Sequence, residues 1–558
     1  MNSDIEIARQ ADIRPIVDIA SNLGIPEEYV ETYGKHKAKV NLKINSDSEI
    51  AGRDNGKLIL VSAMTPTTAG EGKTTTTVGL TDAMAILGHK VVTCMREPSL
   101  GPCFGMKGGG AGGGMSQVIP MEDINLHFNG DFHAITSAHN LIAAILDNHL
   151  HHGNKLNIDP RRIIWQRVLD VNDRALRQVV LGLGGPLNSV PRQDSFSITA
   201  ASEIMAIFCL SNDFQQLREN INAIIVAYDF NNNPVTVSDL KVTGALMALL
   251  KDAIKPNLVQ TLEGNPVFVH GGPFANIAHG CNSIIATKLA MKLADYTITE
   301  AGFGTDLGAE KFFNIKCRKA DVSPNAAVVV ATIKSLKVHG GTAKEDVTQS
   351  DPKAVKEGIE NLKKHIENIQ AFKVPVVVAL NRFSYDSDEE INIVKEQCDY
   401  LGVDVVLCTN WQDGGQGSIE LAQAVTNLCE SHTTDFELLY DDDLSLLSKI
   451  TKIAIEMYGA NEILADKQLR KEIKDLENQG FGHLPICMAK TPGSLSTDPN
   501  LKGRPTNFGV PIRGLRLASG AGFIVVLTGD IITMPGLPKK PAAELIDVDN
   551  NGLINGLS

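Results

Sequence analysis

The chain has 558 residues, of which 43% are hydrophobic, and its formal net charge is −13 at pH 7. This length exceeds what one hydrophobic core organises, so about two to four domains are expected, and the acidic charge argues against nucleic acid as a partner. The sequence contains no run of about 18 apolar residues, as a membrane span requires, and no apolar signal core at its start. Nine scattered cysteines without a C-x-x-C pair are typical of reduced thiols, so we expect a cytoplasmic protein.

A phosphate-binding loop is the strongest early signal in the chain. The apolar run 58–64 leads into T-P-T-T-A-G-E-G-K-T-T-T-T, and the segment 74–88 has a helical composition. The ending Gly72-Lys73-Thr74 matches the pattern G-x-x-x-x-G-K-[ST], although Thr67 stands where the pattern has its first glycine. In such loops backbone N–H groups surround phosphate oxygens, the lysine reaches the terminal phosphates, and the threonine hydroxyl holds Mg²⁺.

The sequence therefore predicts an ATP site, with Lys73 as a catalytic cation and Thr74 as the Mg²⁺ ligand. The positive end of the following helix would face the bound anion. The residues assigned to the nucleotide are Thr67, Thr68, Ala69, Gly70, Glu71, Gly72, Lys73, Thr74 and Thr75. A structural turn without a ligand is the alternative interpretation of the same pattern.

Apolar, β-branched runs alternate with loops and helical stretches over much of the chain. They lie at 58–64, 90–95, 266–270, 295–299, 327–332, 374–380 and 403–408. This alternation predicts an α/β protein with a mostly parallel sheet flanked by helices, like that of P-loop NTPases. We expect this ATP-binding domain to be discontinuous, at 1–152 and 261–455, around an inserted α+β domain at 153–260. Glycine and proline are dense after residue 456, which indicates a small mixed α+β domain at 456–558.

Ligands of open α/β sheets bind where the strands end, and several predicted strands end in polar residues. Arg96 and Glu97 follow the second strand, beside the phosphate loop. A planar guanidinium can bind a carboxylate or an acyl phosphate through two hydrogen bonds. The alternative for Arg96 is a salt bridge to Glu97 or to another acid. The glycine-rich run 107–114 fits a lid, a close backbone approach or an inert linker.

Three aromatic side chains also follow predicted strands: Phe303, Phe383 and Trp411. Only 5% of the residues are aromatic and only two are tryptophan, so this coincidence favours a stacking slot for a flat heterocycle. Ordinary packing against the end of the sheet is the alternative, and the sequence leaves both open.

Long motifs along nearly the whole chain match one known family. They are T-P-T-T-A-G-E-G-K-T-T-T-T, R-E-P-S-L-G-P-C-F-G-M-K-G-G-G-A-G-G-G, D-I-N-L-H-F-N-G-D-F-H-A-I, E-A-G-F-G-T-D-L-G-A-E-K-F-F at 300–313, V-A-L-N-R-F at 378–383 and F-I-V-V-L-T-G-D-I-I-T-M-P-G-L-P near the end. These motifs resemble formate–tetrahydrofolate ligase, also called 10-formyltetrahydrofolate synthetase. The threonine at position 67 is similar to the loop of that family as well.

The resemblance implies that ATP phosphorylates formate and that formyl phosphate then formylates tetrahydrofolate, with ADP and phosphate as the other products. It implies that Lys73 and Mg²⁺ neutralise the transferred phosphoryl group and that Arg96 holds formate. Glu97 would orient folate or accept a proton, Trp411 and Phe383 would sandwich the pterin, and Phe303 would add a further wall. The resemblance also implies a monofunctional bacterial enzyme that forms a homotetramer and is stimulated by a monovalent cation such as K⁺.

Two other functions fit parts of the pattern. A ligase that activates a different carboxylate, as dethiobiotin synthetase does, needs the phosphate loop but no aromatic slot. A nucleotide switch or partition-type ATPase is the second alternative, because Asn381-Arg382-Phe383 has some similarity to the N-K-x-D loop of GTPases. Position 382 is arginine, however, and no aspartate follows in place. Neither function accounts for Arg96 together with the glycine-rich run.

Overall fold

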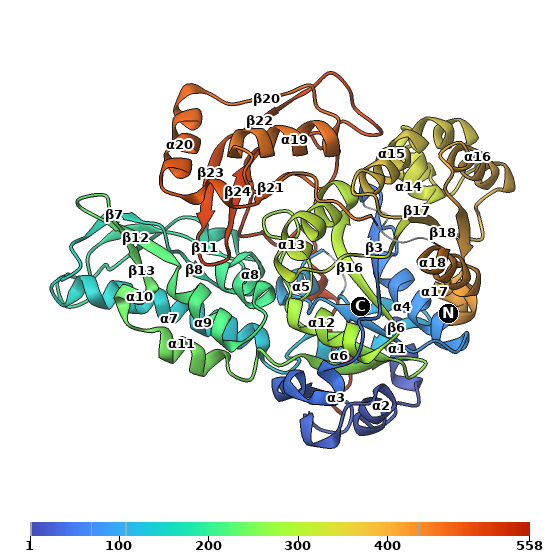
Figure 1. Ribbon diagram of the computed structural model, residues 1–558, viewed down its shortest axis with the longest axis horizontal. Coiled ribbons are helices and arrows are strands. Elements are labelled where there is room, and N and C mark those ends of the chain that lie inside the picture. The colour runs from blue at the N-terminus through green and yellow to red at the C-terminus, as the bar shows by residue number, and fades with distance from the viewer. Residues whose placement is uncertain (1–2, 68–69, 107–108, 432–434, 558) are drawn as a thin grey trace.

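One large sheet runs through the centre of the molecule (Figure 1). The computed structural model describes residues 3–67, 70–106, 109–431 and 435–557, and among these the sheet has 12 strands. Adjacent parallel strands form its middle, in the order β15 (Pro266–Val269), β4 (Val91–Met95), β16 (Tyr296–Gly304), β3 (Lys57–Ala63), β17 (Ala326–Thr332), β18 (Val376–Asn381) and β19 (Val405–Cys408). All the predicted apolar runs are strands here, so the α/β class with a large, mostly parallel sheet is confirmed.

Antiparallel strands extend the sheet beyond β15. They are β14 (Asn257–Thr261), β2 (Ala38–Val40), β1 (Val30–Thr32), β6 (Ser116–Ile119) and β5 (Gly112–Gly113). The short strand β5 is the end of the glycine-rich run, so this part of the run is ordered against β6. Residues 257–260, which we assigned to the inserted domain, contribute to the central sheet.

Helices cover both faces of the parallel strands, because successive strand residues point to opposite sides. Ile59 and Val61 of β3 pack in one cluster with residues of α4 (Lys73–Ile86) and α18 (Ile419–Ser431). Leu58 and Leu60 belong to a second cluster, which includes the apolar face of α15 (Pro352–Gln370). α15 has proline in its first turn, and the side chain of Asp351 caps it by accepting from the Ala354 N–H.

Two further regions flank the central sheet in Figure 1. The first contains α7 (Asp131–His151), α8 (Glu203–Leu210), α9 (Phe214–Asn222) and α11 (Thr243–Leu250), with a sheet of β13 (Pro234–Thr236), β12 (Ile225–Asp229) and β7 (Ile158–Ile163). The second contains α19 (Leu446–Tyr458), α20 (Lys467–Asn478), β21 (Ile486–Ala489), β24 (Phe523–Leu527) and β23 (Gly514–Ala518). One hydrophobic cluster continues through all three regions, so the bounds of the predicted domains stay predictions. Within the described ranges, no helix has the length and apolar character needed to cross a membrane.

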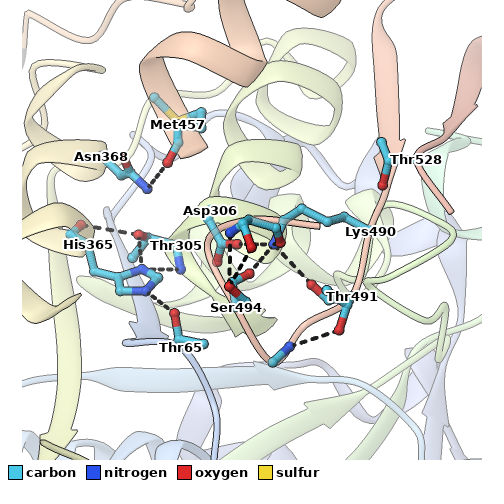
Figure 2. Close-up of polar contacts among 12 residues, drawn as sticks. Thr65, Thr305, Asp306, His365, Asn368, Met457, Lys490, Thr491, Ser494 and Thr528 are labelled. Atoms are coloured by element: carbon cyan, nitrogen blue, oxygen red, sulfur yellow. Dashed lines mark hydrogen bonds and ion pairs between the residues drawn. The ribbon is translucent and has the colours of Figure 1, made fainter. Parts of the chain in front are cut away.

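A buried ion pair joins the C-terminal region to the central one (Figure 2). Lys490 follows β21, and its Nζ lies 3.0 Å from Oδ2 of Asp306 in the π-helical segment Thr305–Ala309. Both side chains are at most 1% exposed. Nζ donates hydrogen bonds to the carbonyl oxygens of Thr491 (3.0 Å) and Ser494. In the described part of the chain neither carboxylate oxygen of Asp306 receives a hydrogen bond, so Lys490 offsets the burial of its charge.

Lys490→Met should destabilise the fold strongly, because the Asp306 carboxylate would stay buried without a partner. Removing one member of a buried pair costs about 3–5 kcal/mol, whereas removing both charges is often neutral. Urea and thermal unfolding should therefore show that Asp306→Leu in the Lys490→Met background recovers much of the loss. Lys353→Met, at an 88% exposed lysine side chain, is the control and should change stability by less than about 1 kcal/mol. A double variant as unstable as Lys490→Met alone would contradict this role for the pair.

Candidate active site

The phosphate loop connects the end of β3 to the start of α4. Gly70 and Gly72 have φ values of +74° and +73°, which glycine adopts without strain. A Cβ at Gly72 would also lie 2.8 Å from Nδ2 of Asn381, the last residue of β18. Glycine at position 72 is therefore needed for the backbone conformation and for packing. Thr68 and Ala69, which the sequence assigns to the site, lie outside the described residues.

Side chains from two helices hold the start of the loop at Thr65. Its N–H donates to Oδ1 of Asn361 (3.2 Å), and its carbonyl accepts from Nε2 of His339 (2.9 Å) in α14 (Ile333–His339). Its hydroxyl lies 2.8 Å from Nε2 of His365 (Figure 2) and accepts from Nδ2 of Asn361 at 2.9 Å. Burial lowers the pKa of His339 to about 4 and that of His365 to about 3. Both rings are thus neutral near pH 7 and act as fixed hydrogen-bond partners.

The carboxylate of Glu71 braces the loop from within. Its Oε1 accepts from the N–H of Thr67 (2.7 Å) and from the hydroxyl of Ser335 in α14 (3.0 Å). Its backbone carbonyl accepts from Nδ2 of Asn381 (2.9 Å), whose Oδ1 accepts from the hydroxyl of Thr76 (3.1 Å). The loop and the first turns of α4 are thereby fixed against α14 and the end of β18.

A buried carboxylate, Glu300 of β16, lies among the cations of the site. Its Oε2 accepts from the hydroxyl of Thr74 (2.9 Å) and lies 3.8 Å from Nζ of Lys73, both in the first turn of α4 with Thr75. Its Oε1 lies 3.7 Å from Nη2 of Arg96. Burial by itself raises the pKa of Glu300, but Lys73, Arg96 and the Thr74 hydroxyl outweigh it and hold the pKa below its ordinary value. Glu300 is therefore ionised at neutral pH.

These groups face a cavity of about 410 Å³. One side of it is polar, with Lys73, Thr74, Arg96, Glu97 and Glu300. The remaining lining is mostly apolar or small, including Pro98, Pro102, Phe274, Ala275, Phe303, Ile532 and Pro535. Nε of Arg96 is buried and has no hydrogen-bond partner within the described ranges. The cavity thus combines two cations with an unused guanidinium donor, which suits an anionic substrate.

Glu97 lines the same cavity and is 5% exposed. Burial, followed by the neighbouring carboxylate of Asp131, raises the pKa of Glu97 well above its ordinary value, against the opposing charge of Lys39. Lys39 itself pairs with Asp131, at 2.7 Å between Nζ and Oδ1. A carboxyl group with a raised pKa is suited to proton transfer near neutral pH.

The three predicted aromatic residues lie in two places. Phe303 lines the cavity and has an unusual φ of +60°, which places its side chain by backbone strain. Phe383 and Trp411 do not line this cavity; they follow β18 and β19, on the other side of β3 in the strand order. They are 38% and 45% exposed, as expected for open rings rather than core. The carbonyl of Trp411 accepts from the Met115 N–H (2.8 Å), next to the glycine-rich run.

Some cavity residues were not predicted as site residues. Glu300 follows from the strand-end rule, since it comes after the predicted strand 295–299, as Phe303 does, and its burial among the cations is visible only in the structure. The segment Gly271-Gly272-Pro273-Phe274-Ala275 follows β15, and its paired glycines are a signal that the strand-end rule would also have found. Ile532 and Pro535 come from the C-terminal region, and no local pattern connects them with the phosphate loop.

The comparisons with known proteins agree over the whole length. The family model described as formate–tetrahydrofolate ligase matches residues 2–558. Curated relatives with that same name include one from Granulibacter bethesdensis, 56% identical over 556 residues (100% of this chain, 97% of the relative). Others are from Rhizobium etli (strain CIAT 652), 58% identical over 557 residues, and Pelagibacter ubique, 55% identical over 559 residues, each with 100% of this chain and 99% of the relative covered. The chain therefore belongs to the formate–tetrahydrofolate ligase family and is a ligase, and the family's reaction joins formate to tetrahydrofolate at the expense of ATP.

Proposed function

We propose that the reaction proceeds through formyl phosphate, formed in the cavity beside the phosphate loop. The supporting observation is the convergence of Lys73, Thr74 and Arg96 on this one cavity, around Glu300. A formate oxygen attacks the terminal phosphorus of ATP, the bond from that phosphorus to the bridging oxygen breaks, and ADP leaves. The formate carboxylate is a poor electrophile, whereas its mixed anhydride with phosphate has a good leaving group.

The loop would bind ATP as the phosphate-binding loop of P-loop NTPases does. Residues 67–75 would surround the phosphates of ATP, and Lys73 would neutralise the charge that develops on the transferred phosphoryl group. Mg²⁺ fits next to Thr74, because its hydroxyl and the Glu300 carboxylate lie 2.9 Å apart and both offer the oxygen ligands that Mg²⁺ prefers. Bound there, the ion would supply charge neutralisation at the phosphates. We also expect stimulation by a monovalent cation such as K⁺, without assigning it a site.

Formate and the pterin of tetrahydrofolate would bind on opposite sides of the phosphate loop. Arg96 would hold formate and then formyl phosphate on the β4 and β16 side. Phe383 and Trp411 would sandwich the pterin on the β18 and β19 side, where both rings are partly open. Phe303 would form the wall against which the reacting amine meets the formyl group.

In the second step the amine between the pterin and the benzoyl ring attacks the formyl carbon. A tetrahedral oxyanion forms, the bond from carbon to the phosphate oxygen breaks, and phosphate leaves. The nitrogen must lose a proton, and Glu97 would accept it, because its raised pKa makes it a stronger base than an ordinary carboxylate.

We further propose a cytoplasmic homotetramer that acts only on small molecules. All nine cysteines are buried and free, which suits a reducing compartment. The hairpin of β9 (Val179–Leu181) and β10 (Arg192–Asp194) supports self-association, because Leu183 and Leu187 at its tip are 66% and 91% exposed. Exposed apolar side chains gathered in this way favour contact with another protein surface.

Lys73→Ala should lower the rate of formyl transfer by about 100-fold or more, because a positioned charge on a developing anion is worth about that much. The assay mixes enzyme, MgATP, formate and tetrahydrofolate, then acidifies and records the methenyl absorbance. Tetrahydrofolate binding should hardly change. Lys57→Ala, at the other end of β3, is the matched control and should keep full activity. A Lys73→Ala enzyme that retains more than about a tenth of the rate would refute the proposed ATP site.

Arg96→Lys should impair formate use rather than ATP use, since it keeps the charge but loses the planar fork. A hydrogen bond to a charged group is worth about 1.5–3 kcal/mol, so kcat/KM for formate should fall by at least about tenfold. Arg504→Lys is the control, because Arg504 makes a two-point contact with Glu367 (2.8 and 2.7 Å) on the surface. Normal formate kinetics in Arg96→Lys would show that another group binds the acid.

Trp411→Ala should weaken tetrahydrofolate binding by roughly ten- to a hundredfold, on the scale of about 1–3 kcal/mol for stacking on one aromatic ring. ATP turnover in the absence of folate should change little. The other indole, Trp165, is 4% exposed and stacks on His139 at 4.1 Å, so its emission is a constant background. Folate should alter the emission of the wild type, and Trp411→Phe should abolish most of that response. An unchanged response in Trp411→Phe would place the pterin elsewhere.

A further inference from the structure

A loop without regular structure, residues 271–280, forms one wall of the cavity. It runs from β15 to α12 (Ile284–Leu293), and Gly272, Phe274 and Ala275 line the cavity directly. Since no helix or strand fixes this stretch, its position depends on separate contacts. One of these contacts comes from Lys311, which follows Ala275 by 36 residues in the chain.

Arg96 depends on the position of this loop. Its Nη1 donates to the carbonyl oxygen of Pro273 (3.4 Å). A Cβ added at Gly302 would lie 2.7 Å from Cβ of Ala275 and 2.8 Å from Nη1 of Arg96. The methyl group of Ala275 and the guanidinium therefore both pack against the backbone of Gly302, and a displacement of the loop changes the space and the acceptor available to Arg96.

Lys311 lies behind the loop and is completely buried, at 0% exposure. It lies between the π-helical segments Thr305–Ala309 and Phe312–Cys317, and its Nζ donates to the carbonyl oxygen of Ala275 at 2.6 Å. This short, charge-assisted hydrogen bond is among the stronger kinds that a backbone carbonyl makes. A buried ammonium costs stability, so a neutral side chain would serve better if the position only filled space.

We propose that Lys311 is a positioning residue for the acid substrate: it holds Ala275, and through the 271–280 loop it keeps Pro273 and Arg96 in place for formate. The inference rests on the proposed role of Arg96, and its expected signature is specific. Loss of the ammonium should weaken formate saturation while leaving ATP saturation largely unchanged, because the phosphate loop is held by other residues, among them Asn361 and His339.

The chain offers a matched control in Lys316, five residues further along. It is also 0% exposed, and its Nζ donates to Asn282 and to the hydroxyl of Thr287 (2.8 Å) instead of the cavity loop. Replacing either lysine by methionine removes a buried ammonium and keeps a similar side-chain length. The two variants should therefore lose similar stability, and only one of them changes the wall of the cavity.

The experiment measures KM for formate, KM for ATP, kcat and the thermal midpoint for Lys311→Met, Lys316→Met and Lys311→Gln. We expect KM for formate to rise by about tenfold in Lys311→Met, with KM for ATP changed by less than about twofold. Lys316→Met should show neither change, and Lys311→Gln, which keeps an N–H donor, should show a smaller rise. If Lys311→Met does not fold, Lys311→Gln carries the same comparison, with a rise in KM for formate alone as the supporting result.

Normal formate saturation in folded Lys311→Met, or in Lys311→Gln where Lys311→Met does not fold, would overturn the proposal, as would an equal rise in Lys316→Met. Arg96→Lys separates this outcome from a failure of the proposed function. If Arg96→Lys impairs formate use and the Lys311 variants do not, the acid site stands and the positioning role is wrong. If neither Arg96→Lys nor the Lys311 variants impair formate use, formate binds outside this cavity, and the proposed roles of Arg96 and Lys311 are both wrong.

Discussion

The anchoring of Thr65 is the constraint on which the rest of the site depends. Between β3 and α4 the described residues of the phosphate loop belong to no helix or strand, so side-chain contacts help to set its shape. Every polar atom of Thr65 meets a side chain of α14 or α15, and two of these, His339 and Asn361, also bond Gly503 of the C-terminal region. Both hydrogen-bonding groups of the Gly503 backbone are used in this way. The C-terminal region is therefore tied to the start of the nucleotide loop, and the same region also contributes Ile532 and Pro535 to the cavity.

Glu300 sets the charge balance of the site. Two cations facing a cavity repel each other, and the buried carboxylate between Lys73 and Arg96 compensates for this. Its distances to them, 3.8 and 3.7 Å, are longer than those of hydrogen-bonded ion pairs, and within the described ranges Nε of Arg96 has no hydrogen-bond partner, so the guanidinium keeps this donor for a ligand. On the proposed assignment, a phosphate or formate anion would add to an arrangement that already exists, and little reorganisation would be needed when charge develops during phosphoryl transfer.

The sequence predicted the parallel strands because burial on both faces leaves continuous β-branched runs, such as 327–332, that local composition reveals. It predicted Lys73, Thr74, Arg96 and Glu97 as neighbours because parallel strands bring their carboxyl ends to one edge. It did not separate Phe303 from Phe383 and Trp411, since that requires the strand order, in which β16 and β18 lie on opposite sides of β3. The sequence did not predict the roles of Lys311 and Ile532 for another reason. Their contacts join segments that are distant in the chain, and no periodicity of the sequence indicates such contacts.

The strand order has a consequence for a two-step ligase. β3 delivers the phosphate loop between β16 and β17, so the groups suited to the acid lie on one side of the loop and the open aromatic rings on the other. The phosphoryl group takes part in both proposed steps: it is transferred to formate in the first and leaves as phosphate in the second. On the proposed mechanism, a loop placed between the two sides would stabilise that group in both steps. On the proposed mechanism, the wall formed by residues 271–280 borders the space that would hold the anhydride until the amine attacks it.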